Sequence, residues 1–404
     1  MTGPQWGRYS DGMSESPAGL NKAAMQALAA GDVATAEALL LRLVTADPAS
    51  IPGWLNLAAV RRRQNNPAGA FAALGEVMRL EPRNFAALLM SATLLEREGR
   101  VKAAAETYGA ALSNAPPDQY LDEATRQAVA HGREIHGRHT GEMHDFIRAR
   151  VSEAQSQCAP DERRRVDAFI ATTLRVRKRY QQEPLEYYFP GLPAIEFYER
   201  AEFPWLEELE AATEPMQREL AAILREDQAG FAPYIHYDDR TPLDQWRELN
   251  HSPRWSAFHF YEKGEPIAER CNRAPATMQI LSRLPQAQVP LRSPSALFSV
   301  LQPHTRIPPH TGIANFRLVV HLPLIVPPGC GFRVGGETRQ WRLGEAWVFD
   351  DTIEHEAWND SDQTRIIFIC DVWSPRLSPE ERAAIGQVIA ASDAFNGTQP
   401  SSSV

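Results

Sequence analysis

The chain has 404 residues and an apolar fraction of 43%, so we expect two or more soluble domains, each with its own core. Its formal net charge of −9 argues against a nucleic-acid binder, which normally presents a basic face. The four cysteines lack C-x-x-C spacing, which disfavours a zinc site or a disulfide framework. No apolar run reaches the length of a membrane span, and the first residues lack a signal-peptide core. We therefore predict a cytoplasmic protein that binds no nucleic acid.

Residues 1–14 are predicted to be a flexible tail, and residues 15–117 a helical repeat array. A 34-residue period relates the turn residues Gly31, Asn65 and Gly99. The same period aligns two alanines and one proline in each unit, namely Ala24, Ala58, Ala92, Ala36, Ala70, Ala104, Pro48, Pro82 and Pro116. Small residues let paired helices approach closely, and proline ends the second helix of a unit. This period is typical of the tetratricopeptide repeat, whereas the alternative is an alanine-rich bundle without repeats.

Residues 118–185 are polar and charged, and we interpret them as a helical capping and linker region. Four histidines lie here: His131, His136, His139 and His144. Their spacing does not place all four on one helical face, so ordinary surface histidines are a better interpretation than a metal cluster.

Residues 186–380 are predicted to form a jelly-roll domain, and residues 381–404 a C-terminal helix with a disordered tail. Residues 205–226 have the pattern of an amphipathic helix that could back a sheet. Short β-type segments follow at 255–261, 296–301, 316–322 and 365–373. Proline and glycine punctuate these segments, as in a jelly roll. The expected fold class is therefore α+β, with an all-helical solenoid followed by a double-stranded β-helix.

Two histidines, His310 and His355, flank the most strand-rich block of this domain. Imidazole suits iron(II), and the usual non-haem site adds one carboxylate to two histidines. That carboxylate normally lies two residues after the first histidine, where this chain has Gly312. Asp350 or Asp351 could supply it instead, or act on the metal through water.

Strand alternation places three sets of residues on common faces: Arg317, Val319 and His321; Arg365, Ile367 and Ile369; and Leu297, Ser299 and Leu301. Arg317 and His321 lie in a run that is too apolar for an exposed strand. Because buried arginines are uncommon unless they are paired, a bound carboxylate is a natural partner. His304, six residues before His310, remains a rival for the metal.

Several segments resemble the aspartyl/asparaginyl β-hydroxylase family of iron(II)/2-oxoglutarate dioxygenases, which carry H-T-G rather than H-x-D. The matching segments are P-H-T-G-I-A-N (309–315), R-L-V-V-H-L (317–322), F-D-D-T-I-E-H-E-A-W (349–358), R-I-I-F-I-C-D-V-W (365–373) and L-S-P-E-E (377–381). The resemblance covers about residues 185–380.

The resemblance implies a role for each of seven site residues. His310 and His355 would be the iron ligands. The 2-oxoglutarate contacts would be Arg365 and Ser299 at the distal carboxylate, His321 at the other end, and Tyr261 at a further position. Arg317 would anchor a substrate carboxylate. Asp351 is an eighth site candidate, on the separate ground that it could act on the metal through water where Gly312 supplies no carboxylate. Some relatives carry a second arginine where this chain has Val319.

The implied activity is hydroxylation of the β-carbon of an Asp or Asn residue in a peptide or protein. Iron(II), 2-oxoglutarate and O2 would be required, and succinate and carbon dioxide released. The repeat array would engage the polypeptide, because a solenoid presents an extended concave surface. The alternatives are a lipid A or acyl-chain hydroxylase and a non-catalytic repeat scaffold with an inactive barrel. The sequence indicates neither the substrate's identity nor the oligomeric state.

Overall fold

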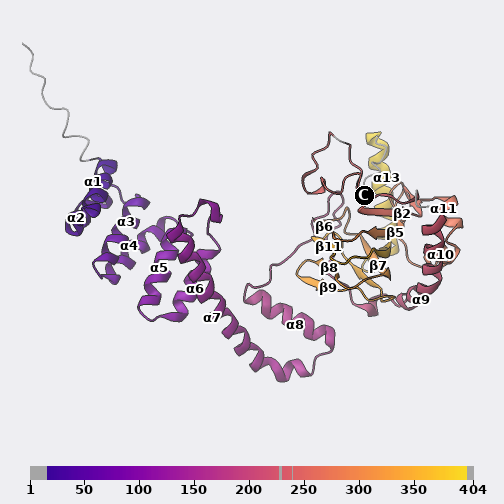
Figure 1. Ribbon diagram of the computed structural model, residues 1–404, viewed down its shortest axis with the longest axis horizontal. Coiled ribbons are helices and arrows are strands. Elements are labelled where there is room, and N and C mark those ends of the chain that lie inside the picture. Colours follow the sequence, from indigo (N-terminus) through magenta and orange to yellow (C-terminus); the bar gives the residue numbers. More distant parts are fainter. Residues whose placement is uncertain (1–15, 227–229, 239, 398–404) are drawn as a thin grey trace, which may run out of the picture. The chain divides into compact units, whose positions relative to one another are not determined.

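The computed structural model describes residues 16–226, 230–238 and 240–397. The chain divides into two compact units, Met1–Ala159 and Pro160–Val404 (Figure 1). The predicted tail at residues 1–14 and the last part of the predicted C-terminal tail, residues 398–404, lie outside the described residues. Among the described helices, none is both long enough and apolar enough to cross a membrane.

The first unit contains three successive helix pairs. They are α1 (Pro17–Ala29) with α2 (Val33–Ala46), α3 (Ile51–Arg63) with α4 (Pro67–Leu80), and α5 (Phe85–Arg97) with α6 (Val101–Leu112). Gly31, Asn65 and Gly99 have φ values of 82°, 56° and 73°, the left-handed backbone that glycine and asparagine tolerate best. All six aligned alanines have 0% exposure, so adjacent helices meet through them. The predicted tetratricopeptide-type array is therefore confirmed.

A 34-residue helix, α7 (Glu123–Ser156), packs against α6. Its contact is close because Gly132 leaves room for the ring of Tyr108. The Nε2 atom of His131 lies 2.8 Å from a Glu96 carboxylate oxygen, and the Nδ1 atom of His136 lies 3.0 Å from the Ala105 carbonyl. These two histidines thus have structural partners in the array.

The second unit is built on two antiparallel sheets. The six-stranded sheet has the order β1-β2-β5-β12-β7-β10, with bounds Ala232–Pro233, Trp255–His259, Ala296–Leu301, Arg365–Trp373, Arg317–Ile325 and Trp347–Phe349. The four-stranded sheet has the order β6-β11-β8-β9, with bounds Thr305–His310, His355–Asn359, Cys330–Val334 and Glu337–Arg339. Side chains from both sheets share one core, as expected for a jelly roll. The predicted α+β class is confirmed.

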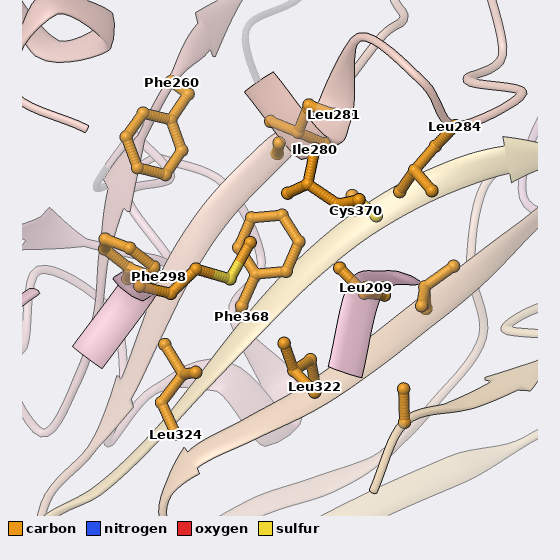
Figure 2. Close-up of a cluster of buried hydrophobic side chains, with 14 of the residues drawn as sticks. Leu209, Phe260, Ile280, Leu281, Leu284, Phe298, Leu322, Leu324, Phe368 and Cys370 are labelled. Atoms are coloured by element: carbon orange, nitrogen blue, oxygen red, sulfur yellow. The ribbon is translucent and has the colours of Figure 1, made fainter. Parts of the chain in front are cut away.

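Helices cover the outer face of the six-stranded sheet. They include α9 (Leu206–Ala211), α10 (Thr213–Glu226) and α12 (Pro275–Leu281). Figure 2 shows the apolar cluster between these helices and the strands, with Leu209, Phe298, Leu322 and Phe368 among its members. Because side chains alternate along a strand, the neighbours of these residues point to the opposite face, where the two sheets meet.

The predicted helix at 205–226 is interrupted at Ala212, between α9 and α10. Pro215 explains the interruption, because proline has no backbone N–H to donate to the carbonyl of Ala211. The unit also contains α8 (Pro160–Thr173), the β3–β4 hairpin (Tyr261–Glu262 and Glu265–Pro266), α11 (Ala268–Asn272) and α13 (Pro379–Asn396). A capping box between Ser378 and Glu381 fixes the start of α13.

Candidate active site

A cavity of about 780 Å³ lies among the strands of the second unit. Seven of the eight residues predicted for the site line it: Ser299, His310, Arg317, His321, Asp351, His355 and Arg365. They come from β5, β6, β7, β11, β12 and the loop before β11. The pairing of these strands therefore brings together residues that lie up to 66 positions apart in the sequence.

His310 ends β6 and His355 begins β11, and the two residues face each other across this strand pair. Their ring centroids are 4.1 Å apart. The Nδ1 atom of His310 lies 2.7 Å from the Pro308 carbonyl, and that of His355 lies 3.0 Å from the Ile353 carbonyl. A carbonyl only accepts, so each Nδ1 carries the hydrogen and each Nε2 keeps its lone pair for a metal.

The two imidazoles are also neutral at physiological pH. Burial and the neighbouring His355 lower the pKa of His310 to about 3. Burial lowers the pKa of His355 to about 4. Neutral imidazole is the form that binds a metal, so no proton has to be removed first.

Asp351 occupies the space that a side chain at Gly312 would need. A Cβ atom on Gly312 would lie 2.1 Å from Oδ2 of Asp351. The Oδ2 atom also accepts a hydrogen bond from Arg317 at 3.3 Å, while the buried Oδ1 atom has no partner. A carboxylate is therefore present beside His310, although it comes from another loop.

The other candidates for the metal are placed elsewhere. Asp350 does not line the cavity, and its Oδ1 atom accepts hydrogen bonds from the backbone and hydroxyl of Thr352. His304 is exposed and lies 2.9 Å from Asp362. Within the described residues, no three His, Cys, Asp or Glu side chains converge as a metal site. The arrangement thus fits a metal held by two histidines, with its remaining positions left for small ligands.

Arg365 is buried in the cavity wall, and no acidic side chain among the described residues pairs with it. Its side chain is 1% exposed, and its Nε and Nη1 atoms have no hydrogen-bond partner. Burial lowers the pKa of Arg365 to about 10, which leaves the guanidinium charged at neutral pH. The Nδ1 atom of His321 is likewise buried without a partner. An anionic ligand would satisfy these groups.

Arg317 differs from Arg365 because acidic groups surround it. Asp351 accepts its hydrogen bond, and the charge of Asp371 also raises the pKa of Arg317. Asp371 is itself held by the Ser293 hydroxyl at 2.7 Å and the Ser295 backbone N–H at 2.9 Å. Arg317 and His321 are four residues apart on β7, about 13 Å along the strand. Arg317 pairs with Trp373 of β12, eight residues from Arg365 on that strand, so the two guanidinium groups occupy separate positions in the cavity.

Tyr261 lies apart from the other seven predicted site residues, and its role as a cosubstrate contact stays a prediction. Tyr261 does not line the cavity but packs against the outer core, with its hydroxyl 3.5 Å from Gln286. Tyr261, which only the family resemblance suggested, begins the short strand β3, two residues beyond the end of β2. Trp255, in β2, does line the cavity, and its indole N–H donates to the Ser299 hydroxyl at 3.3 Å.

Aromatic residues that sequence reasoning missed surround His310. Trp246 and Trp255 have ring centroids 5.1 Å and 6.3 Å from that of His310. Tyr234 stacks on Trp255 at 4.0 Å. Their signal in the sequence was only a general aromatic enrichment, because the segment that carries Tyr234 and Trp246 has no strand pattern.

The family comparison agrees with this geometry. The family model described as aspartyl/asparaginyl beta-hydroxylase matches residues 210–375. The human aspartyl/asparaginyl beta-hydroxylase is 37% identical over 144 residues, which are 35% of this chain and 19% of that protein. The ornithine lipid ester-linked acyl 2-hydroxylase of Rhizobium tropici is 31% identical over 199 residues, 48% of this chain and 66% of that protein.

The chain thus spans about a fifth of the length of its human relative. Among solved structures, the Arabidopsis OM64 TPR domain is similar, with 20% identity, a TM-score of 0.27, and coverage of 30% of this chain and 98% of that one. The fold of the array rests on its own helix pairs rather than on this likeness. The β-sheet unit of this chain belongs to the aspartyl/asparaginyl β-hydroxylase family, and a tetratricopeptide-type array precedes it.

Proposed function

We propose that the β-sheet unit is an iron(II)- and 2-oxoglutarate-dependent dioxygenase that hydroxylates the β-carbon of an aspartyl or asparaginyl residue in a polypeptide. One observation carries the proposal. The imidazoles of His310 and His355 are each oriented by a backbone carbonyl. They share a cavity with the buried guanidinium of Arg365, whose Nε and Nη1 atoms have no hydrogen-bond partner among the described residues. This combination suits a metal together with a small anionic ligand.

His310 and His355 would hold the iron through their Nε2 atoms, and Asp351 would act beside it through the unpartnered Oδ1 atom. Bound iron and 2-oxoglutarate would supply the oxygen chemistry, with succinate and carbon dioxide as products. Trp246 and Trp255 pack beside His310 and would exclude water from this side of the site.

Arg365 would bind the distal carboxylate of 2-oxoglutarate, with the Ser299 hydroxyl and His321 nearby. The unpartnered guanidinium nitrogens support this role, because a carboxylate accepts two parallel hydrogen bonds from them. Arg317 would position the substrate through its carboxylate or amide, since it lies on the same strand face as His321 and retains only a 3.3 Å hydrogen bond to Asp351.

We also propose that the repeat array engages the polypeptide substrate. Stacked helix pairs present an extended surface that suits an extended chain. The array has a self-contained alanine and leucine core and no cluster of metal-ligating side chains among its described residues, so its contribution would be binding rather than chemistry.

An acyl chain is a second candidate substrate, because one exposed apolar residue lines the cavity and two others adjoin lining residues in the sequence. Leu185 lines the cavity and is 71% exposed. Leu291 and Phe395, next to the lining residues Arg292 and Asn396, are 47% and 91% exposed. The acidic residues Glu183 and Glu186, which also line the cavity, favour a polypeptide with basic groups over an anionic lipid surface.

The test is to incubate the purified full-length protein with iron(II), 2-oxoglutarate and O2, and to offer cell peptides and lipid extracts separately. We expect succinate formation and a peptide that gains one oxygen on an Asp or Asn residue, both absent in His310→Ala. A gain of oxygen only in lipids would select the acyl-chain alternative. No succinate with any substrate would indicate a non-catalytic scaffold.

A further inference from the structure

Trp341 lies between β9 and β10, outside every motif that the sequence suggested. Its side chain is 5% exposed and lines the cavity. Its indole nitrogen is buried and has no hydrogen-bond partner. Because buried polar groups in native proteins are nearly always paired, an unpaired indole N–H in a cavity wall indicates that a ligand supplies the acceptor.

The neighbours of Trp341 identify the charge of that ligand. The guanidinium carbon of Arg365 lies 4.9 Å from the Trp341 ring centroid, and the His321 ring lies 6.0 Å from it. Both neighbours also have buried nitrogen atoms without partners. No described carboxylate pairs with Arg365, whereas Asp351 and Asp371 are engaged near Arg317 and Ser293. This end of the cavity therefore offers donors without acceptors, which suits an anion.

We propose that Trp341 is a positioning residue that donates its indole N–H to the distal carboxylate of 2-oxoglutarate. The inference rests on the proposed function and extends it to a residue that none of the matching segments contains. A carboxylate has about four lone-pair sites, so it can accept two hydrogen bonds from Arg365 and a third from an indole.

Trp341 would also hold Arg365 in place. The guanidinium lies over the indole face, which attracts a cation. The indole in turn stacks on Phe332 at 5.4 Å and on Trp347 at 5.8 Å, so packing fixes its orientation. A fixed wall behind Arg365 would select a dicarboxylate of one length, because the metal-binding end and the Arg365 end are both held by strands.

Trp347 provides a matched control. Its indole nitrogen is also buried without a partner, and it belongs to the same aromatic stack. Unlike Trp341, it does not line the cavity. Trp347→Phe thus removes an equivalent N–H from the stack without removing a donor from the ligand site.

The experiment is calorimetric titration of the full-length, Mn(II)-loaded protein under anaerobic conditions with two ligands. One is 2-oxoglutarate, and the other is 2-oxopentanoate, which lacks the distal carboxylate. For 2-oxoglutarate, Trp341→Phe should raise the Kd about tenfold, as expected for one hydrogen bond to a charged group, while Trp347→Phe should stay within about twofold of wild type. For 2-oxopentanoate, all three proteins should have the same Kd.

Three outcomes would overturn the inference. An unchanged Kd for 2-oxoglutarate in Trp341→Phe would remove Trp341 from the site and leave the proposed function intact. Equal losses for both ligands would show a general packing defect rather than a lost donor. If the wild-type protein does not bind 2-oxoglutarate at all, the proposed function fails together with the inference. A Kd does not depend on the fraction of folded protein, so partial misfolding of the variant would not imitate the expected result.

Discussion

The repeat array and the β-sheet unit bury their side chains in contrasting ways. In the described part of the array, the one buried side-chain polar atom without a partner is the Ser91 hydroxyl. In the described part of the β-sheet unit, seven residues have such atoms: Arg365, His321, Asp351 and Trp341 line one cavity, whereas Gln286, Trp347 and Arg382 do not line it. A core whose buried polar atoms are nearly all hydrogen-bonded needs no ligand. Unpaired polar atoms around a cavity, in contrast, indicate a ligand-binding site.

The largest expected effect comes from removing the metal ligands. His310→Ala or His355→Ala should weaken iron(II) binding by more than about 100-fold, since altering outer-shell partners alone typically costs 10–100-fold. Anaerobic equilibrium dialysis measures the affinity, and circular dichroism checks the fold. His304→Ala is the control, because this exposed histidine pairs with Asp362 outside the cavity. Metal binding that survives in either ligand variant, or disappears in the control, would refute the assignment.

A smaller effect is expected from one added methyl group. Gly312→Ala should weaken iron(II) binding or turnover about tenfold, because the new Cβ would displace the Asp351 carboxylate. The backbone of Gly312 is not left-handed, so the substitution tests this contact rather than strain. Kinetic assays and metal titration of the variant measure the effect.

Gly75→Ala in α4 is the corresponding change in the array. A Cβ there meets nothing within 4 Å. It should stabilise the array by about 0.5–1 kcal/mol, since alanine is the better helix former, and leave iron binding unchanged. Equal responses of the two glycine variants in metal affinity would contradict the contrast between the two units.

The smallest effect concerns pH. The pKa values of His310 and His355 are lowered to about 3 and about 4, so both imidazoles stay neutral as the pH falls from 7 to 5. Iron(II) affinity should therefore change less than about threefold over this range, whereas an imidazole of ordinary pKa would lose roughly 30-fold at pH 5. Anaerobic titrations at pH 7 and pH 5 measure the iron(II) affinity. A steep loss of affinity at pH 5 would show that the histidines titrate as exposed groups.

Strand alternation predicted the inner face of the site well. It placed Ser299, Arg317, His321 and Arg365 on faces that the structure brings into one cavity. Tyr261, which was suggested by family resemblance and not by alternation, lies two residues beyond the end of β2 and does not line this cavity. The array was predictable throughout its three repeats, since each unit contacts mainly its neighbours.

The contacts that complete the site could not be predicted in this way. Gly312 and Asp351 are 39 positions apart and lie in loops, so their contact depends on how β6 pairs with β11. Trp341 lies outside any strand, and its burial follows from stacking on Phe332 and Trp347. Such contacts are defined by tertiary packing, which no periodicity in the sequence reports.

The central claim is that Arg365 has no hydrogen-bond partner among the described residues because a ligand supplies one. Replacing it with methionine removes the charge and keeps an apolar side chain. Arg365→Met should raise the Kd for 2-oxoglutarate at least ~30-fold, the effect of losing one member of a buried charge pair. The same variant should be more stable than wild type without ligand, by about 1–3 kcal/mol, because an unsatisfied buried group is removed.

The most direct measurement is denaturant unfolding of the Mn(II)-loaded wild type and Arg365→Met, each with and without 2-oxoglutarate. Ligand at a hundred times the wild-type Kd should stabilise the wild type by about 2.7 kcal/mol but the variant by at most about 0.9 kcal/mol, so the stability advantage of the variant should shrink by about 1.8 kcal/mol or more. A variant that is less stable than wild type without ligand, or equally stabilised by 2-oxoglutarate, would show that Arg365 serves the fold and not the ligand.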